Sequence, residues 1–401
     1  MFWDRPIEHA LTDLKKRVSA PVRVVLWDGR EVAFSDEPRV TVRLKGSRAA
    51  SALVRPSFLS LAEAYIDGHA DLEGDMREAI RGAEAISRSA PKAMLDGGSA
   101  PARHTRRDDR EAIQHHYDVS NEFYALWLDP RMVYSCAYFR TEGDSLEQAQ
   151  FQKLDHICRK LRLTRGDKFL DIGCGWGALA MHAAERYGVD ATGITLSENQ
   201  FRLATERIRA AGLQDRCRVL LLDYRDTPGE EVYDKIASVG MFEHVGLKNL
   251  PEYFGVVRRL LRERGLFLNH GITSSSVESH AVGLGAGEFI GRYVFPRGEV
   301  PHLHLAVHDM SAQQLEVCDV ECLRPHYART LGLWSAQFER RMNDAIAASD
   351  ERTARIWRIY LAGCAHAFEQ GWISIYQLLA SKQTKPGRTA LPLTRDWMYT
   401  P

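Results

Sequence analysis

Apolar and polar residues are spaced differently in the first hundred residues and in the rest of the chain. Arg39–Lys45 alternates, with apolar side chains on one face and basic or hydroxyl side chains on the other, which is typical of a half-buried strand. Val22–Trp27 is a second strand-like segment, and Pro56–Gly68 carries apolar residues at helical spacing. Two strands and a helix over this length predict a small α+β domain at residues 1–95.

A linker then separates this domain from a longer region with a different pattern. Residues 96–112 begin with Asp-Gly-Gly-Ser-Ala-Pro and continue into a charged run, both typical of a domain boundary. Through residues 113–401, short apolar strands alternate with helical segments. The expected strands are Lys168–Ile172, Ala191–Thr195, Arg218–Leu222, Lys235–Val239 and Leu266–Asn269, with a helix at Leu250–Arg264 before the last. This alternation predicts a doubly wound, mostly parallel α/β sheet, whose ligands bind outside the carboxyl ends of its strands.

A glycine-rich loop follows the first of these strands. Leu170–Gly177 places Gly173, Gly175 and Gly177 at alternate positions, and glycine lets the backbone turn tightly and approach a ligand. The spacing is GxGxG rather than the GxGxxG of dinucleotide sites, and no Lys-Ser/Thr pair follows to hold a nucleoside triphosphate. The loop therefore favours an adenosyl ligand without a pyrophosphate, S-adenosylmethionine. A turn that only packs the helix against the strand is the alternative.

The second expected strand ends in polar side chains rather than in an acid. Dinucleotide sites place a carboxylate there to bind a ribose, whereas this chain has Thr195 and Gln200, with Glu198 already on the next helix. One interpretation is that Thr195 and Gln200 contact the cofactor. The other is that these residues cap the helix.

Composition and charge narrow the possible partners. The chain has 53 basic and 53 acidic side chains, which argues against attraction of the whole protein to nucleic acid. The longest stretches without a charged residue have 13 residues, fewer than the roughly 18 that a membrane-spanning helix needs. The N-terminus carries no apolar signal region, so we expect a cytoplasmic protein. Seven cysteines without a CxxC motif indicate reduced thiols, and we expect no metal site.

One charged segment has two interpretations. Between Arg39 and Arg55 there are five basic residues and no acidic one. This face can be a solvated strand surface. It can also be a docking surface for anionic phospholipid, where each basic group contributes about 1 kcal/mol.

Several motifs in the longer region resemble the cyclopropane-fatty-acyl-phospholipid synthases and their relatives, the mycolic acid cyclopropane synthases and methyltransferases. The motifs are His116–Tyr124, Tyr134–Tyr138, Leu170–Gly177, Val239–Gly246, His270–Ile272, Tyr293–Pro296, Tyr327 and Tyr360–Ala365. The resemblance covers about residues 113–381. Leu61–Gly68 is similar to the N-terminal domain of the bacterial members that act on membrane phospholipid, a domain that the mycolic acid enzymes lack.

This resemblance implies an S-adenosylmethionine-dependent C-methyltransferase. Residues 113–401 would form its Rossmann-like domain with acyl-binding insertions, and residues 1–95 would form a lipid-docking domain. The reaction transfers a methylene group to a cis double bond of an unsaturated acyl chain in membrane phospholipid and forms a cyclopropane ring. Attack by the alkene leaves a carbocation, which aromatic faces can stabilise by about 0.5–2 kcal/mol each and which a base must deprotonate. The family implies bound bicarbonate as that base. It also implies a homodimer that associates peripherally with the inner face of the membrane.

The resemblance also assigns residues to the two ligands. Bicarbonate would be held by Cys136, Glu243, His270, Ile272 and Tyr327. Glu243 would accept from the bicarbonate hydroxyl, Cys136 and Tyr327 would donate, His270 would do either according to its tautomer, and Ile272 would contribute its backbone. The cofactor would contact Tyr134, Ser135, Gly173, Gly175, Gly177, Thr195, Gln200, Tyr224 and Arg225.

Cys364 matches the cysteine assigned to the active site in this family. It lies in the apolar helical run Ile359–Phe368 without a basic neighbour, so a buried structural thiol is an equal interpretation.

Two alternative functions remain open. A C-methyltransferase acting on the same acyl chains would leave a methyl branch or a methylene group if the proton were lost elsewhere. A non-catalytic lipid-binding protein could retain the same fold.

Overall fold

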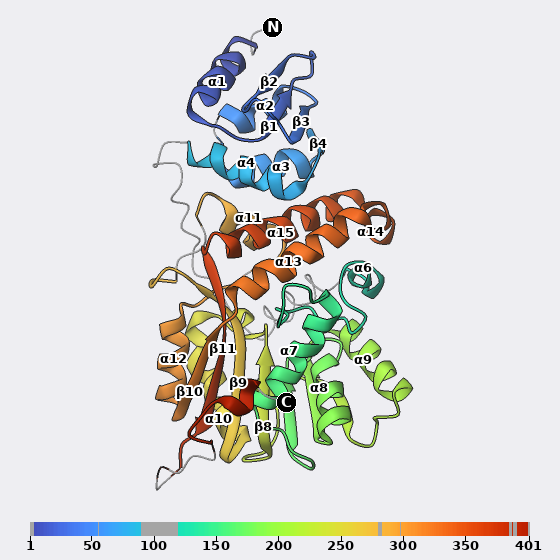
Figure 1. The fold of residues 1–401 in the computed structure, drawn as a ribbon, viewed down its shortest axis with the longest axis vertical. Helices are drawn as coiled ribbons and strands as arrows, with labels where there is room; N and C mark the ends of the chain where they lie inside the picture. Colours follow the sequence, from blue (N-terminus) through green and yellow to red (C-terminus); the bar gives the residue numbers. More distant parts are fainter. Residues whose placement is uncertain are drawn as a thin grey trace. The chain divides into compact units, whose positions relative to one another are not determined.

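The computed structural model describes residues 4–54, 56–89, 119–279, 283–296, 298–384, 387 and 391–399 (Figure 1). The chain divides into two compact units. The first unit comprises Met1–Pro101, Ala281–Pro296 and Trp334–Gln370, and the second comprises Ala102–His280, Arg297–Leu333 and Gly371–Pro401. The first unit therefore includes two segments that lie far beyond residue 95 in the sequence. The expected linker at 96–112 and the start of the His116–Tyr124 motif lie outside the described residues.

The N-terminal part of the first unit is the expected small α+β domain. Its strands pair in the order β2-β1-β3-β4 and are β1 (Val22–Val25), β2 (Glu31–Ala33), β3 (Val40–Leu44) and β4 (Ala70–Glu73). Its helices are α1 (Asp4–Arg17), α2 (Ser47–Val54), α3 (Phe58–Ile66) and α4 (Met76–Arg88). The helix expected at Pro56–Gly68 is α3, which begins in a capping box formed by Ser57 and Ser60.

Helices from the C-terminal half of the chain belong to the same unit: α11 (Ala286–Tyr293), α14 (Met342–Ala348), α15 (Glu351–Glu369) and the end of α13 (Arg324–Arg340). Of these, α11 packs against α3, and α15 packs against α3 and α4. Several polar contacts join α15 to the domain. Among them, Arg355 Nη2 lies 2.9 Å from Asp71 Oδ1, Arg358 Nη1 donates to Tyr65 Oη at 2.9 Å, and His366 Nε2 lies 2.6 Å from Glu84 Oε2. Short-range sequence patterns carry no sign of these contacts, because their partners are about 280 residues apart.

The basic face of β3 is an ion-paired surface. Arg43 lies 2.6 Å from Glu73, and Lys45 lies 2.7 Å from Asp71, both acids being on β4. Arg39 is 3.6 Å from Glu78 of α4. Because a carboxylate faces each of these cations, the geometry favours the interpretation of a solvated strand face over that of a positive docking surface.

A seven-stranded sheet forms the centre of the second unit (Figure 1). Its order is β10-β11-β9-β8-β5-β6-β7. The five strands from β9 to β7 are parallel, whereas β11 and β10 run antiparallel at one edge. The strands are β5 (Lys168–Ile172), β6 (Asp190–Thr195), β7 (Cys217–Leu221), β8 (Tyr233–Val239), β9 (Leu261–Ser274), β10 (Leu315–Cys322) and β11 (Ile373–Lys382). All five expected strands are present, and the predicted doubly wound fold is confirmed.

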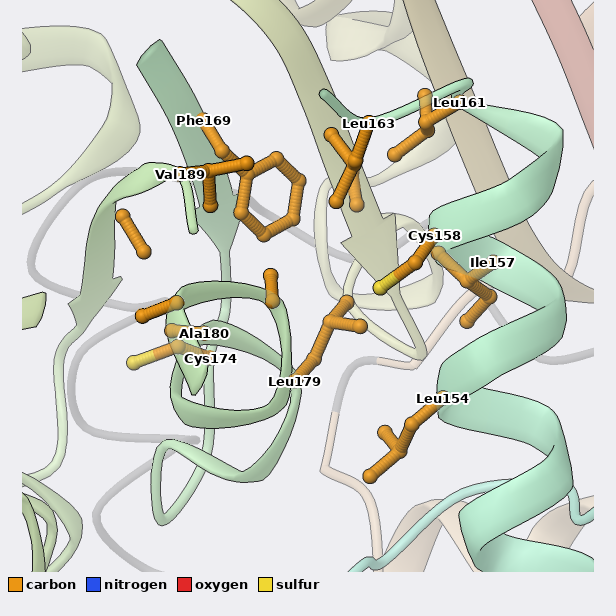
Figure 2. Close-up of a cluster of buried hydrophobic side chains, with 14 of the residues drawn as sticks. Leu154, Ile157, Cys158, Leu161, Leu163, Phe169, Cys174, Leu179, Ala180 and Val189 are labelled. Carbon is orange, nitrogen blue, oxygen red and sulfur yellow. The ribbon is translucent and has the colours of Figure 1, made fainter. Parts of the chain in front are cut away.

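Helices cover both faces of this sheet. The adjacent β5 residues Phe169 and Leu170 enter two different apolar clusters, since successive side chains of a strand point to opposite faces. Figure 2 shows the cluster around Phe169, where Leu154 and Ile157 face Leu179 across the core. Its helices are α7 (Leu146–Lys160), α8 (Ala178–His182) and α9 (Glu198–Ala210), and the opposite face is covered by α10 (Leu250–Leu260) and α12 (Leu303–Ala312). Two shorter helices are α6 (Asn121–Ala125) and α16 (Asp396–Tyr399).

One expected boundary is wrong. The sequence pattern continued the helix to Arg264, but α10 ends at Leu260 and β9 starts at Leu261, which pairs with Tyr233 of β8. Pairing with a neighbouring strand outweighs the local helical preference of this segment. The reversal of strand order, with β6 on one side of β5 and β8 on the other, is where the fold opens a crevice for a ligand.

Candidate active site

The three glycines of the loop after β5 all adopt left-handed backbone conformations. Their φ values are +76° at Gly173, +56° at Gly175 and +81° at Gly177, a region that disfavours other residues. A Cβ at Gly173 would lie 2.9 Å from the Met241 side chain, and one at Gly177 would lie 3.2 Å from Ala204 Cβ. A Cβ at Gly175 would have no atom within 4 Å among the described residues. Gly175 therefore faces open space, whereas the other two allow close packing.

That open space is a cavity of about 130 Å³ at the carboxyl ends of β5, β6 and β8. Eight of the nine residues that the resemblance assigned to the cofactor line it: Tyr134, Ser135, Gly173, Gly175, Thr195, Gln200, Tyr224 and Arg225. Gly177 lies outside this lining and packs against α9 instead.

Three polar residues at the end of β6 and the start of α9 have different roles. The Ser197 hydroxyl accepts from Gln200 N at 3.3 Å and caps α9. The Thr195 hydroxyl donates to Gln200 Oε1 at 2.7 Å, and both side chains line the cavity. Ser197 provides the cap, and the Thr195 hydroxyl also accepts from Ser197 N at 3.2 Å. Thr195 and Gln200 both line the cavity, where the Gln200 amide nitrogen is a donor for a ligand.

Arg225 and Tyr224 lie in a short 3-10 helix, η3 (Tyr224–Asp226), on the cavity wall. The Arg225 guanidinium donates twice to the Asp223 carboxylate, at 2.9 and 2.6 Å. The same guanidinium lies 5.3 Å from the centre of the Tyr224 ring. Arg225 is therefore oriented by Asp223.

Two further buried titratable residues, which the sequence pattern did not predict, lie on the cavity wall. Lys153 of α7 donates to Ser135 Oγ at 2.8 Å, and burial lowers its pKa to about 8. Burial also raises the pKa of Asp171 on β5 to about 7, despite the opposing effect of Lys153. Lys153 could have been found from the sequence, because it occupies a core-facing position of α7 three residues after the buried Gln150.

A second polar cluster lies at the ends of β8 and β9. Glu243 belongs to η4 (Phe242–His244), and its Oε1 accepts from Ile272 N at 2.6 Å. Its other oxygen, Oε2, is buried and has no partner among the described residues. Burial raises the pKa of the Glu243 carboxyl to about 7. The site therefore holds a buried acceptor without a hydrogen-bond partner in the described residues. This arrangement costs folding free energy unless a ligand donates to the acceptor.

Within the described residues, His270 supplies an unpaired hydrogen-bond donor, whereas Glu243 supplies an unpaired acceptor. It is fully buried on β9 opposite Gln377 of β11, whose amide Nε2 donates to His270 Nδ1 at 3.3 Å. That contact places the proton on Nε2, which is buried and has no partner in the described part of the chain. Burial holds the pKa of His270 well below its usual value, so the ring is neutral.

A glycine explains how Glu243 reaches β9. A Cβ at Gly271 would overlap the ring of Phe242, which packs directly over this position. Gly271 therefore lets η4 lie against the strand between His270 and Ile272. A glycine is needed at this position because the Phe242 ring leaves no room for a side chain.

The Cys136 thiol and the backbone N–H of Tyr327 share one acceptor, the carbonyl oxygen of Leu323. The Cys136 thiol, which is fully buried, lies 3.8 Å from Leu323 O, and the same oxygen accepts from Tyr327 N at 3.0 Å. Leu323 N in turn donates to Ile375 O, two residues before Gln377 on β11. Strand β11, which pairs with β9, thus connects this pair with His270. Burial raises the pKa of Cys136, which keeps it a thiol and a possible donor.

Cys364 lies in α15, which belongs to the first unit, whereas the other candidate residues lie in the second. Burial raises the pKa of its thiol to about 12, and no charged group opposes this effect. A thiol with this pKa is not activated as a nucleophile. Among the residues that the structure describes, no group of three or more potential metal ligands occurs, and no helix is long and apolar enough to cross a membrane.

The sheet, the glycine loop and the cavity at the strand reversal define an S-adenosylmethionine-dependent methyltransferase. Residues 104–378 match the family described as mycolic acid cyclopropane synthetase, and the chain belongs to this family. Residues 11–92 match a domain of unknown function (DUF7884).

The relatives differ in how much of this chain they match. The chain is 49% identical to a probable fatty acid methyltransferase of Pseudomonas putida over 382 residues, covering 94% of this chain and 96% of that protein. It is 38% identical to the cyclopropane-fatty-acyl-phospholipid synthase of Escherichia coli K12 over 272 residues, 68% of each chain. The solved cyclopropane synthase CmaA1, in complex with SAH and CTAB, has a TM-score of 0.64 and 36% identity, covering 68% of this chain and 98% of its own. The shorter match to CmaA1 leaves about a third of this chain without a counterpart there.

Proposed function

We propose that this enzyme transfers a methylene group from S-adenosylmethionine to a cis double bond of an unsaturated acyl chain in membrane phospholipid, with bicarbonate as the bound base. The product is a cyclopropane ring. The observation that carries the proposal is the pair of buried, unpartnered atoms, Glu243 Oε2 and His270 Nε2.

The cofactor cavity suits S-adenosylmethionine in shape and chemistry. The open space over Gly175 allows close approach of an adenosyl group, and Thr195 and Gln200 present polar groups beside it. When bound, S-adenosylmethionine supplies an electrophilic methyl group. The chain's own residues hold and orient it and keep water away.

The second cluster suits bicarbonate. This anion has one hydroxyl donor and several acceptor oxygens, so it needs one strong acceptor and two or more donors. Ionised Glu243 Oε2 is the acceptor, and His270 Nε2–H is a donor. The family resemblance adds the Cys136 thiol and the Tyr327 hydroxyl as donors. When bound, bicarbonate supplies a base, and Glu243 fixes which oxygen carries its proton.

The alternative product is a methyl-branched or methylene-bearing acyl chain. This alternative is tested because a relative that matches 94% of this chain is named a probable fatty acid methyltransferase. Methyl transfer followed by proton loss leaves either a ring or a double bond, so a methyl-branched alkene, an exocyclic methylene and the cyclopropane all add one CH2 and have the same mass. Pure protein should therefore be incubated with S-adenosylmethionine and vesicles of unsaturated phospholipid, and the acyl chains analysed by proton NMR. High-field ring methylene signals support the proposal. A branched methyl signal or the vinylic signal of an exocyclic methylene supports the alternative, and cofactor binding without turnover contradicts both.

We further propose peripheral association with the cytoplasmic membrane face and a homodimeric state. The substrate class supports the first, because the double bond lies within a bilayer. Sedimentation with phospholipid vesicles and light scattering of the free protein test the two proposals separately.

A further inference from the structure

Lys153 is a buried cation on the wall of the cofactor cavity. Its side chain is 2% exposed, and it lines the cavity beside Ser135 and Asp171. An ammonium group has three donors, and within the described residues Lys153 uses one of them, toward Ser135 Oγ. It forms no ion pair with a described carboxylate, although Asp129 and Asp171 are close enough to act through space.

The other buried lysine of the same helix is satisfied differently. Lys160 lies 2.6 Å from Glu321 and 3.2 Å from Asp319, so two carboxylates balance its charge. A buried cation without such a partner is costly, and the cost falls when a ligand brings an anionic group. At neutral pH, Lys153 with a pKa of about 8 remains mostly protonated.

We propose that Lys153, together with Ser135, binds the carboxylate of the methionine portion of S-adenosylmethionine. This inference rests on the proposed function and adds a binding residue to it. The carboxylate is the cofactor's one anionic group, and Lys153 is a cation on the cavity wall with donors to spare. Arg225, a second cation on that wall, is already held in two hydrogen bonds by Asp223.

Lys153 could instead have a purely structural role, which would affect ligand binding differently. Lys153 also anchors the segment around Ser135, and Gln150 does the same without charge, since its amide donates to Val133 O at 3.2 Å and to Ser135 O at 2.9 Å. If Lys153 acts only by holding that segment, its loss affects every adenosyl ligand equally. If it contacts the carboxylate, its loss affects only ligands that carry one.

Calorimetry with two ligands separates these roles. The ligands are S-adenosylhomocysteine and its decarboxylated analogue, which keeps the adenosine and the ammonium group. Lys153→Met should weaken S-adenosylhomocysteine binding by about ten- to a hundredfold, as expected for one charged hydrogen bond, and should change binding of the analogue less than about threefold. Gln150→Met is the matched control and should weaken both ligands by the same factor.

Equal weakening of both ligands by Lys153→Met, or no weakening of either, would overturn the inference. Thermal unfolding first establishes that the variant is folded. If it is not, the wild-type protein still decides, because equal affinities for the two ligands would mean that nothing in the site recognises the carboxylate. Failure of S-adenosylhomocysteine to bind wild type would instead count against the proposed function itself.

Discussion

Replacing Glu243 by glutamine should slow the enzyme and stabilise it at the same time. The variant keeps the size of the side chain, and its amide oxygen can still accept from Ile272 N. Its NH2 group then occupies the position of Oε2, so a donor stands where the bicarbonate hydroxyl needs an acceptor. Loss of one charged hydrogen bond, about 1.5–3 kcal/mol, predicts a ten- to hundredfold lower kcat.

The stability effect follows from the raised pKa of Glu243. A carboxyl with a pKa of about 7 in the folded protein and 4.5 when unfolded binds its proton more tightly in the folded state. The free energy of unfolding of wild type therefore falls as pH rises from about 4.5 through 7, by up to about 3 kcal/mol. Glu243→Gln removes this loss, so the variant should be the more stable protein at pH 8 and should lose that advantage below pH 4.5.

The assay measures turnover on vesicles of unsaturated phospholipid at controlled bicarbonate and pH, with thermal unfolding in parallel. Wild-type turnover should rise with pH up to about 7, as Glu243 ionises, and should fall when bicarbonate is removed. The variant should need more bicarbonate, while its affinity for S-adenosylhomocysteine stays within about twofold. Wild-type turnover that is unchanged without bicarbonate would refute the bound-base mechanism and leave Glu243 as the base itself.

Three further substitutions test other parts of the site. Gly175→Val should abolish S-adenosylhomocysteine binding in calorimetry while the protein stays folded, because the new side chain projects into the cavity; unchanged affinity would show that the loop is misassigned. Gly271→Ala should lower Tm by the equivalent of about 1–3 kcal/mol and reduce turnover, and adding Phe242→Ala should restore part of the turnover, since the clash is with that ring. Cys364→Ala should leave kcat within about twofold of wild type; a loss above tenfold in a folded variant would restore a catalytic role for this thiol.

Local sequence determined the elements and the loop. The five parallel strands, the two domains' fold classes and the glycine-rich turn follow from short-range apolar periodicity and from the backbone freedom of glycine, which the left-handed φ values at Gly173, Gly175 and Gly177 illustrate. The family motifs then named eight residues that line one cavity.

Tertiary structure alone decided which of these residues are unsatisfied and how they are charged. Glu243 gains its raised pKa and its free oxygen only when β9 covers it, and His270 is fixed as a neutral donor by Gln377, 107 residues later in the chain. The lone hydrogen bond of Lys153 and the close fit of Phe242 over Gly271 are likewise invisible in a linear pattern. Periodicity reports which side of an element is apolar, whereas desolvation and hydrogen-bond pairing depend on atoms that distant segments bring together.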